Sequence, residues 1–170
     1  MSRRLIFSLI AVAALLGAGW FLFLPEPPLL LPQLDRIVVY KAERRMELFA
    51  KGKLIYTISG IQLGDAPVGQ KQFEGDEKTP EGRYTIDLRN PRSSYHLSLR
   101  VSYPDETARS FAAAQQRSPG GDIFIHGQPN AMPLWRMAGD WTDGCVAVSN
   151  REIEALWRVV PVGTAIEILP

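Results

Sequence analysis

Residues 123–145 read IFIHGQPNAMPLWRMAGDWTDGC and end in the only cysteine of the chain, Cys145. The apolar run 123–125 predicts a short buried strand that carries His126 at its end. Residues 127–143 are rich in proline and glycine and predict a long loop, and loops of that length are often functional. A histidine before the loop and a thiol after it indicate nucleophilic catalysis.

The expected chemistry depends on removing the proton of Cys145. A thiolate is the nucleophile, and a free cysteine with a pKa of about 8.5 is mostly protonated at neutral pH. His126 within hydrogen-bond reach would accept the proton and hold a thiolate–imidazolium pair. We expect His126 as the base because it ends an apolar strand and Gly127 after it allows close approach of a substrate or backbone. The other histidine, His96, falls on the polar face of a different predicted strand, where it could line the cleft.

The turn before the cysteine is a candidate oxyanion site. The N–H groups of Gly144 and Cys145 can point at a developing oxyanion, and a side chain at position 144 would obstruct them. The alternative is that Asp143-Gly144 is only a β-turn, and both readings can hold together. The group that orients the histidine stays open between Asp143, Asp140 and a backbone carbonyl.

Asp122 is an unsuitable orienting group, since four residues along a strand span about 13 Å. His96, His126 and Cys145 lack the spacing of a metal site, and we expect neither a metal nor another cofactor. Two alternatives for the cysteine are a small buried hydrophobic residue and a redox-sensing thiol.

The N-terminus predicts export of the rest of the chain. Residues 5–24 carry no charge and as a helix would span roughly 30 Å, the thickness of a bilayer core. Arg3 and Arg4 before this run predict a cytoplasmic N-terminus. The competing hypothesis is a signal peptide cleaved near residues 17–19, but the apolar run continues past that point.

We therefore divide the chain into a transmembrane signal anchor (1–24), a proline-rich linker (25–35) and a catalytic domain (36–170). The expected location is a single-pass inner-membrane protein with its domain in the periplasm. The net charge of the chain is +1. Because nucleic-acid binding usually needs a strongly basic face, we do not expect it here.

The pattern of the remaining sequence predicts an α+β, mainly-β domain with two helices. Strands are expected where apolar and polar residues alternate or β-branched residues gather. A helix is expected over residues 105–117, and a second begins at the capping box formed by Ser149 and Glu152. The expected strands cover residues 36–40, 46–50, 54–58, 84–88, 97–103, 123–125 and 164–169.

These motifs together resemble the L,D-transpeptidase catalytic domain (YkuD-like) family. Its signature is a His-Gly pair followed, after a variable loop, by Ser/Thr-x-Gly-Cys-x-Arg, which His126-Gly127 and residues 142–145 match. Residues 79–84, TPEGRY, resemble an upstream turn of the family. The resemblance implies a β-sandwich and a cysteine that attacks the bond between the L-centre of diaminopimelate and a terminal D-alanine. The thioester would then be resolved by an amine, which makes a crosslink or attaches a protein, or by water.

The resemblance also suggests further site residues and one departure. We assign substrate binding to Thr142, Asp143, His96 and Tyr84. Ala147 stands where the family usually has arginine, and residues 141–150 resemble a divergent branch with members that release proteins from the wall by hydrolysis. The expected partners are peptidoglycan stem peptides, with a wall-anchored protein as a further candidate. The alternatives to a transpeptidase are an L,D-specific hydrolase and a non-catalytic peptidoglycan-binding module.

Overall fold

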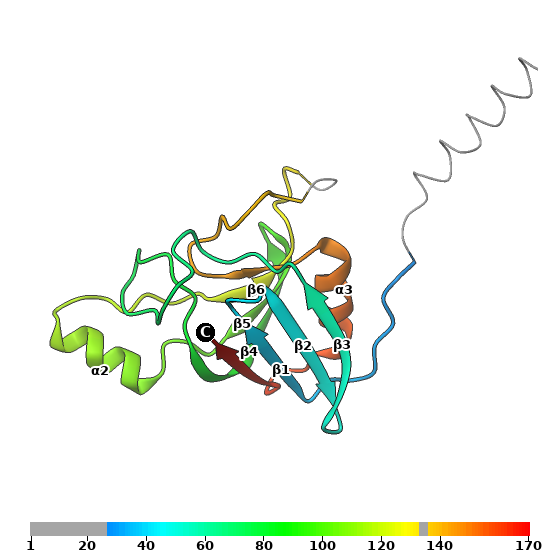
Figure 1. Cartoon of the computed structure of the whole chain (residues 1–170), viewed down its shortest axis with the longest axis horizontal. Helices are drawn as coiled ribbons and strands as arrows, with labels where there is room; N and C mark the ends of the chain where they lie inside the picture. The colour runs from blue at the N-terminus through cyan, green and yellow to red at the C-terminus, as the bar shows by residue number, and fades with distance from the viewer. Residues whose placement is uncertain (1–26, 133–135) are drawn as a thin grey trace, which may run out of the picture.

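The computed structural model describes residues 27–132 and 136–170 (Figure 1). The predicted anchor, residues 1–24, lies outside the described residues. Among the helices within those two ranges, none is both long and apolar enough to cross a membrane.

The described domain is mainly β, as the alternating pattern predicts. Its eight strands run in the order β3-β2-β1-β8-β4-β5-β6-β7, with α2 at one side of the domain and α3 packed against β5 and β6 (Figure 1). The strands are β1 (Arg36–Tyr40), β2 (Arg45–Ala50), β3 (Lys53–Ser59), β4 (Gly82–Ser93), β5 (His96–Val101), β6 (Phe124–His126), β7 (Val146–Ala147) and β8 (Ala165–Leu169), and the helices are α2 (Glu106–Ala114) and α3 (Asn150–Val159).

Strand β4 joins the two halves of the sheet. Its first residues pair with β8, and from Ile86 onward it pairs with β5. Register shifts next to Ile86 and between Asn90 and Ser93 bend the strand, as bulges do. Buried side chains from both halves form one core, which includes Val39 and Leu48 from one half and Leu99 and Ile125 from the other. The sheet is therefore one curled surface, where the sequence predicts a sandwich.

Helix α3 begins as its sequence predicts. Ser149 and Glu152 form both hydrogen bonds of the capping box. The first turn of the helix lies against Gly127, where a Cβ atom would come within 2.5 Å of Asn150 Oδ1 and 3.0 Å of Ile153 Cγ2. Gly127 therefore allows the start of α3 to approach the end of β6.

Three local predictions differ from the structure. The helix predicted over residues 105–117 covers only Glu106–Ala114 and so ends three residues early. The two-residue strand β7 is absent from the sequence prediction because it is too short to show alternation. Ser98, two residues after His96 and so on the face predicted to be polar, is buried, and it lies opposite His126 in the β5–β6 pair.

Candidate active site

Parallel pairing of β6 with β7 brings the histidine and the cysteine together. His126 lies opposite Ala147, and Cys145 immediately precedes β7. The N–H of Phe124, two residues before His126, donates to Cys145 Sγ at 3.4 Å. The sulfur of Cys145 therefore lies beside the strand that carries the imidazole of His126. Both line one cavity of about 290 Å³.

Another part of the cavity wall comes from the β4–β5 hairpin. Sequence reasoning missed this wall, because its residues are short and polar and follow no periodic pattern. Besides the thiol and the imidazole, the cavity is lined by Asn90, Arg92, Ser93, Ser94, Tyr95, Ser98, Asp122 and Phe124.

A backbone carbonyl orients His126, which resolves the alternatives left open by the sequence. His126 Nδ1 lies 2.7 Å from the carbonyl oxygen of Gly127. A carbonyl oxygen only accepts, so Nδ1 carries the proton and Nε2 is left as the acceptor. Asp140 is held elsewhere, by the guanidinium of Arg44 and the N–H of Leu63. Burial lowers the pKa of His126, which favours the neutral imidazole.

Two aromatic side chains fix the plane of the imidazole. The Tyr95 ring centroid lies 4.6 Å from that of His126, and the Trp141 centroid lies 5.6 Å from it in an edge-on orientation. Tyr95 and Trp141 also contact each other. The imidazole therefore has little freedom to rotate away from the cavity.

The thiol is held in its protonated form at rest. Burial raises the pKa of Cys145 to about 11; the N–H of Phe124 and the charge of Lys71 oppose the rise, and Asp143 and Asp122 add to it. The S–H also points at the carbonyl oxygen of Asp122, 3.6 Å away. The expected thiolate–imidazolium pair is thus not the resting state, because the pKa shifts of both partners favour their neutral forms.

The turn that carries the cysteine is held by its own residues. Thr142 Oγ1 donates to the carbonyl of Cys145 at 2.8 Å and accepts from the N–H of Gly144 at 3.2 Å. The predicted oxyanion role of Gly144 therefore needs correction, because its N–H already has a partner within the turn. The N–H of Cys145 stays as the candidate donor.

Two glycines let neighbouring backbone pack against this turn. Gly144 has a φ of +116°, and a Cβ atom on it would lie 2.5 Å from the carbonyl oxygen of Lys78. A Cβ atom on Gly64 would lie 1.9 Å from the carbonyl oxygen of Glu77 and 2.9 Å from the N of Gly144. The backbone of residues 77 and 78 thus packs against the turn that carries Cys145.

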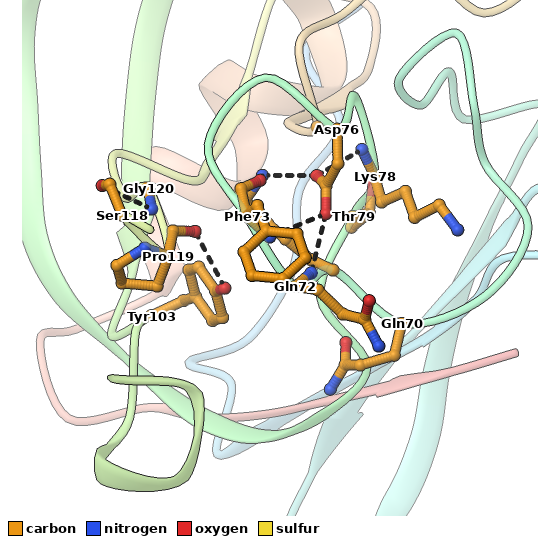
Figure 2. A network of polar contacts seen from close by, with 12 residues as sticks. Gln70, Gln72, Phe73, Asp76, Lys78, Thr79, Tyr103, Ser118, Pro119 and Gly120 are labelled. Atoms are coloured by element: carbon orange, nitrogen blue, oxygen red, sulfur yellow. Dashed lines mark hydrogen bonds and ion pairs between the residues drawn. The ribbon is translucent and has the colours of Figure 1, made fainter. Parts of the chain in front are cut away.

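Asp76 organises that supporting segment, as Figure 2 shows. Its Oδ2 accepts from the N–H groups of Gln72 (2.7 Å) and Phe73 (3.0 Å), and its Oδ1 accepts from the N–H of Lys78 (3.2 Å). Oδ1 also lies 2.7 Å from the buried ammonium of Lys71. Burial alone would raise the pKa of Asp76, but these donors together hold it below its ordinary value.

The structure does not bring the four predicted substrate-binding residues to the cavity. Tyr84 is buried in the core and donates its hydroxyl hydrogen to the carbonyl of Glu81. His96 pairs with Glu154 at 2.8 Å on the surface of α3. Thr142 is used within its own turn, and Asp143 is exposed.

Comparison with known proteins points to one family. The sequence model of the L,D-transpeptidase catalytic domain, YkuD, matches residues 34–168. The chain is 25% identical to Escherichia coli K12 YafK over 129 residues, which are 73% of this chain and 46% of YafK.

Solved structures agree with this match. The helical cell shape determining protein Pgp2 of Campylobacter jejuni is 26% identical with a TM-score of 0.64, over 81% of this chain and 48% of Pgp2. An L,D-transpeptidase from Xylanimonas cellulosilytica shares the fold at 16% identity and a TM-score of 0.54, over 92% of this chain and 68% of that one. The chain spans about half the length of YafK and Pgp2. With a family model that matches residues 34–168 and with His126 and Cys145 of the two motifs in one cavity, the chain belongs to the L,D-transpeptidase catalytic domain family.

Proposed function

We propose that this protein catalyses cysteine-dependent acyl transfer on peptidoglycan stem peptides. The observation that carries the proposal is the shared cavity of Cys145 and His126, in which Nδ1 of the imidazole is engaged and Nε2 is left to accept a proton. Nucleophilic catalysis by a thiol requires a base close to the sulfur, and the shared cavity supports this role for His126.

In the proposed reaction the proton of the thiol passes to His126 Nε2 while Cys145 Sγ attacks the carbonyl carbon at the L-centre of diaminopimelate. The imidazolium then gives this proton to the departing amine, and the acyl group stays on sulfur as a thioester. An acceptor amine attacks the thioester, and its proton returns through the imidazole as the thiol is released. Because both groups rest in neutral forms, the ion pair exists only along the reaction path.

Hydrolysis of the same thioester is the second candidate. Ala147 is fully buried opposite His126 and places a methyl group where the resemblance leads one to expect arginine. With water as the acceptor, the enzyme would trim stem peptides or release a protein attached to them. A non-catalytic wall-binding module is the third candidate, because a thiol with a pKa of about 11 is a weak resting nucleophile.

The masses of the products distinguish these candidates. The full-length protein is incubated with purified disaccharide tetrapeptides, with and without a second stem as acceptor. Loss of D-alanine with a gained stem indicates transfer, and loss of D-alanine with a gained water indicates hydrolysis. If neither product forms while the peptides still bind, the catalytic proposal is wrong and the binding module is favoured.

We further propose that the domain acts outside the cytoplasm, attached to the inner membrane through residues 5–24. The support is the uncharged run after Arg3 and Arg4. Protease added to spheroplasts should degrade the domain while a cytoplasmic marker stays intact, and protection of the domain would contradict this location.

A further inference from the structure

Arg92 gives the cavity that holds the candidate catalytic pair a positive charge. It lies near the tip of the β4–β5 hairpin and is the only lysine or arginine among the described residues that line the cavity. The only carboxylate side chain in that lining belongs to Asp122, whose backbone carbonyl faces the sulfur. A guanidinium and the catalytic pair therefore open into the same space.

The guanidinium of Arg92 lacks an acidic partner among the described residues. The ion pairs between residues within 27–132 and 136–170 do not include it. Other arginines of the same hairpin are engaged: Arg83 with Glu167, and Arg100 with Asp87. Arg92 thus keeps an exposed, unneutralised charge at the edge of a cavity, where an anionic group of a ligand can meet it.

The hairpin tip is tied to the loop that follows His126, so the backbone at Arg92 has a fixed place relative to His126. Asn130 donates from Nδ2 to the carbonyl of Ser93 at 2.9 Å and from its backbone N–H to the carbonyl of Ser94 at 3.0 Å. Asn130 Oδ1 accepts from the N–H of His96 at 2.8 Å. The N–H of Arg92 itself donates to Asn90 Oδ1 at 3.0 Å.

From this geometry we propose that Arg92 binds a free carboxylate of the stem peptide, next to the bond that Cys145 attacks. The inference rests on the proposed function and deepens it. The planar fork of a guanidinium matches a carboxylate and can bind it through two parallel hydrogen bonds. A cavity of about 290 Å³ equals the space of about ten waters at about 30 Å³ each, which suits a short peptide segment.

Arg92 is placed to recognise substrate and not to activate the sulfur. The charges that act on the thiol are those of Asp143, Asp122 and Lys71, and Arg92 is not among them. Its proposed partner is therefore a carboxylate of the stem peptide near the scissile bond. A stem offers two such groups beside the scissile bond, the second carboxylate of diaminopimelate and the terminal carboxylate of D-alanine.

The test measures peptide binding in full-length Cys145→Ala protein, so it does not depend on turnover. Three tetrapeptides are titrated: the unmodified peptide, one amidated at the second carboxylate of diaminopimelate, and one amidated at D-alanine. Arg92→Ala should weaken binding of the unmodified peptide about ten- to a hundredfold, the range for a hydrogen bond to a charged group. The amidated peptide that lacks the recognised carboxylate should bind equally to the Cys145→Ala protein with and without the Arg92→Ala substitution. The peptide that behaves in this way identifies the carboxylate that Arg92 binds.

Arg92→Lys should restore part of the affinity, and Arg83→Ala, on the same strand but paired with Glu167, should leave it unchanged. The inference is overturned if Arg92→Ala weakens all three peptides equally, leaves all three unchanged, or if none of them binds. Failure of the proposed function gives a different result. Arg92→Ala then still weakens binding of the unmodified peptide but not of one amidated peptide, while protein with an intact Cys145 converts none of the peptides.

Discussion

The two walls of the cavity are built in opposite ways. The nucleophile wall, the side of the cavity that carries Cys145, is backed by close-packed backbone: a Cβ atom on Gly64 or Gly144 would meet the carbonyls of residues 77 and 78, and Asp76 holds that segment. The hairpin wall, residues 90–95, is polar, partly exposed and carries the unpaired charge of Arg92. The comparison teaches that rigidity and accessible charge are separated: tight packing holds the turn that carries Cys145, and the hairpin exposes polar groups that the proposed function assigns to substrate recognition.

Removing the base should have the largest effect on chemistry and little effect on recognition. We expect His126→Gln to lower kcat about 10²- to 10⁴-fold, the usual contribution of a positioned base, while peptide affinity stays close to wild type. In the wild type, kcat/KM should fall in acid with a midpoint below 6.5, because burial lowers the pKa of His126. Steady-state kinetics and peptide titration measure both. A wild-type kcat in His126→Gln would show that His126 does not act as the base.

A methyl group at position 64 should disrupt the nucleophile wall. Gly64→Ala places a Cβ atom 1.9 Å from the carbonyl of Glu77, so backbone must shift. We expect a loss of about 3 kcal/mol in the free energy of unfolding, as for overpacked sites, and about a hundredfold loss of kcat from the displaced turn. Gly121→Ala is the matched control, since its Cβ would meet only Pro104 Cδ at 3.7 Å. Equal stability of the two variants would refute the tight packing.

Loss of the charge of Asp76 should weaken the support of that wall. Asp76→Asn leaves the buried ammonium of Lys71 without its anion, and we expect a loss of about 2 kcal/mol in the free energy of unfolding. The pKa of Asp76 is depressed in the folded state, so its stabilisation is complete above the ordinary value of 3.8 and is lost as the pH falls through the lower folded value. Urea unfolding between pH 7 and pH 2 should therefore show a smaller acid loss for Asp76→Asn than for the wild type, and identical profiles would count against this role.

The smallest expected effect concerns the charge beside the thiol. Asp143 raises the pKa of Cys145, so Asp143→Asn should lower it and speed alkylation by iodoacetamide at pH 8 about two- to threefold. Asp143 is exposed, so the gain should vanish in 1 M salt, where the Debye length is about 3 Å. Asp65→Asn, exposed and not among the charges that act on the thiol, serves as the control. A slower reaction of Asp143→Asn would contradict the electrostatic assignment.

The elements marked by a local sequence pattern could be predicted from the sequence. Alternation marks the long strands, and the Ser149–Glu152 capping box marks the start of α3. That His126 and Cys145 would open into one cavity could also be anticipated, because an apolar strand and a glycine turn are local features. The length of β4 and the existence of β7 were not, since they depend on partners far away in the chain.

The parts of the site that the sequence does not reveal depend on tertiary contacts. The need for glycine at position 64 comes from the carbonyl of Glu77, and nothing in the neighbouring sequence marks it. Asp76 resembles any loop aspartate until the loop folds around its carboxylate. Tyr84, chosen through a motif, belongs to the core, because that motif positions backbone and not substrate-binding side chains.

The intact mass of the protein, quenched in acid during reaction with a tetrapeptide stem, tests the central claim most directly. The account predicts that wild-type protein gains the mass of the stem without its D-alanine, attached at Cys145, and that Cys145→Ala protein gains nothing and forms no product. Product formation by Cys145→Ala, or an adduct on another residue, would contradict it.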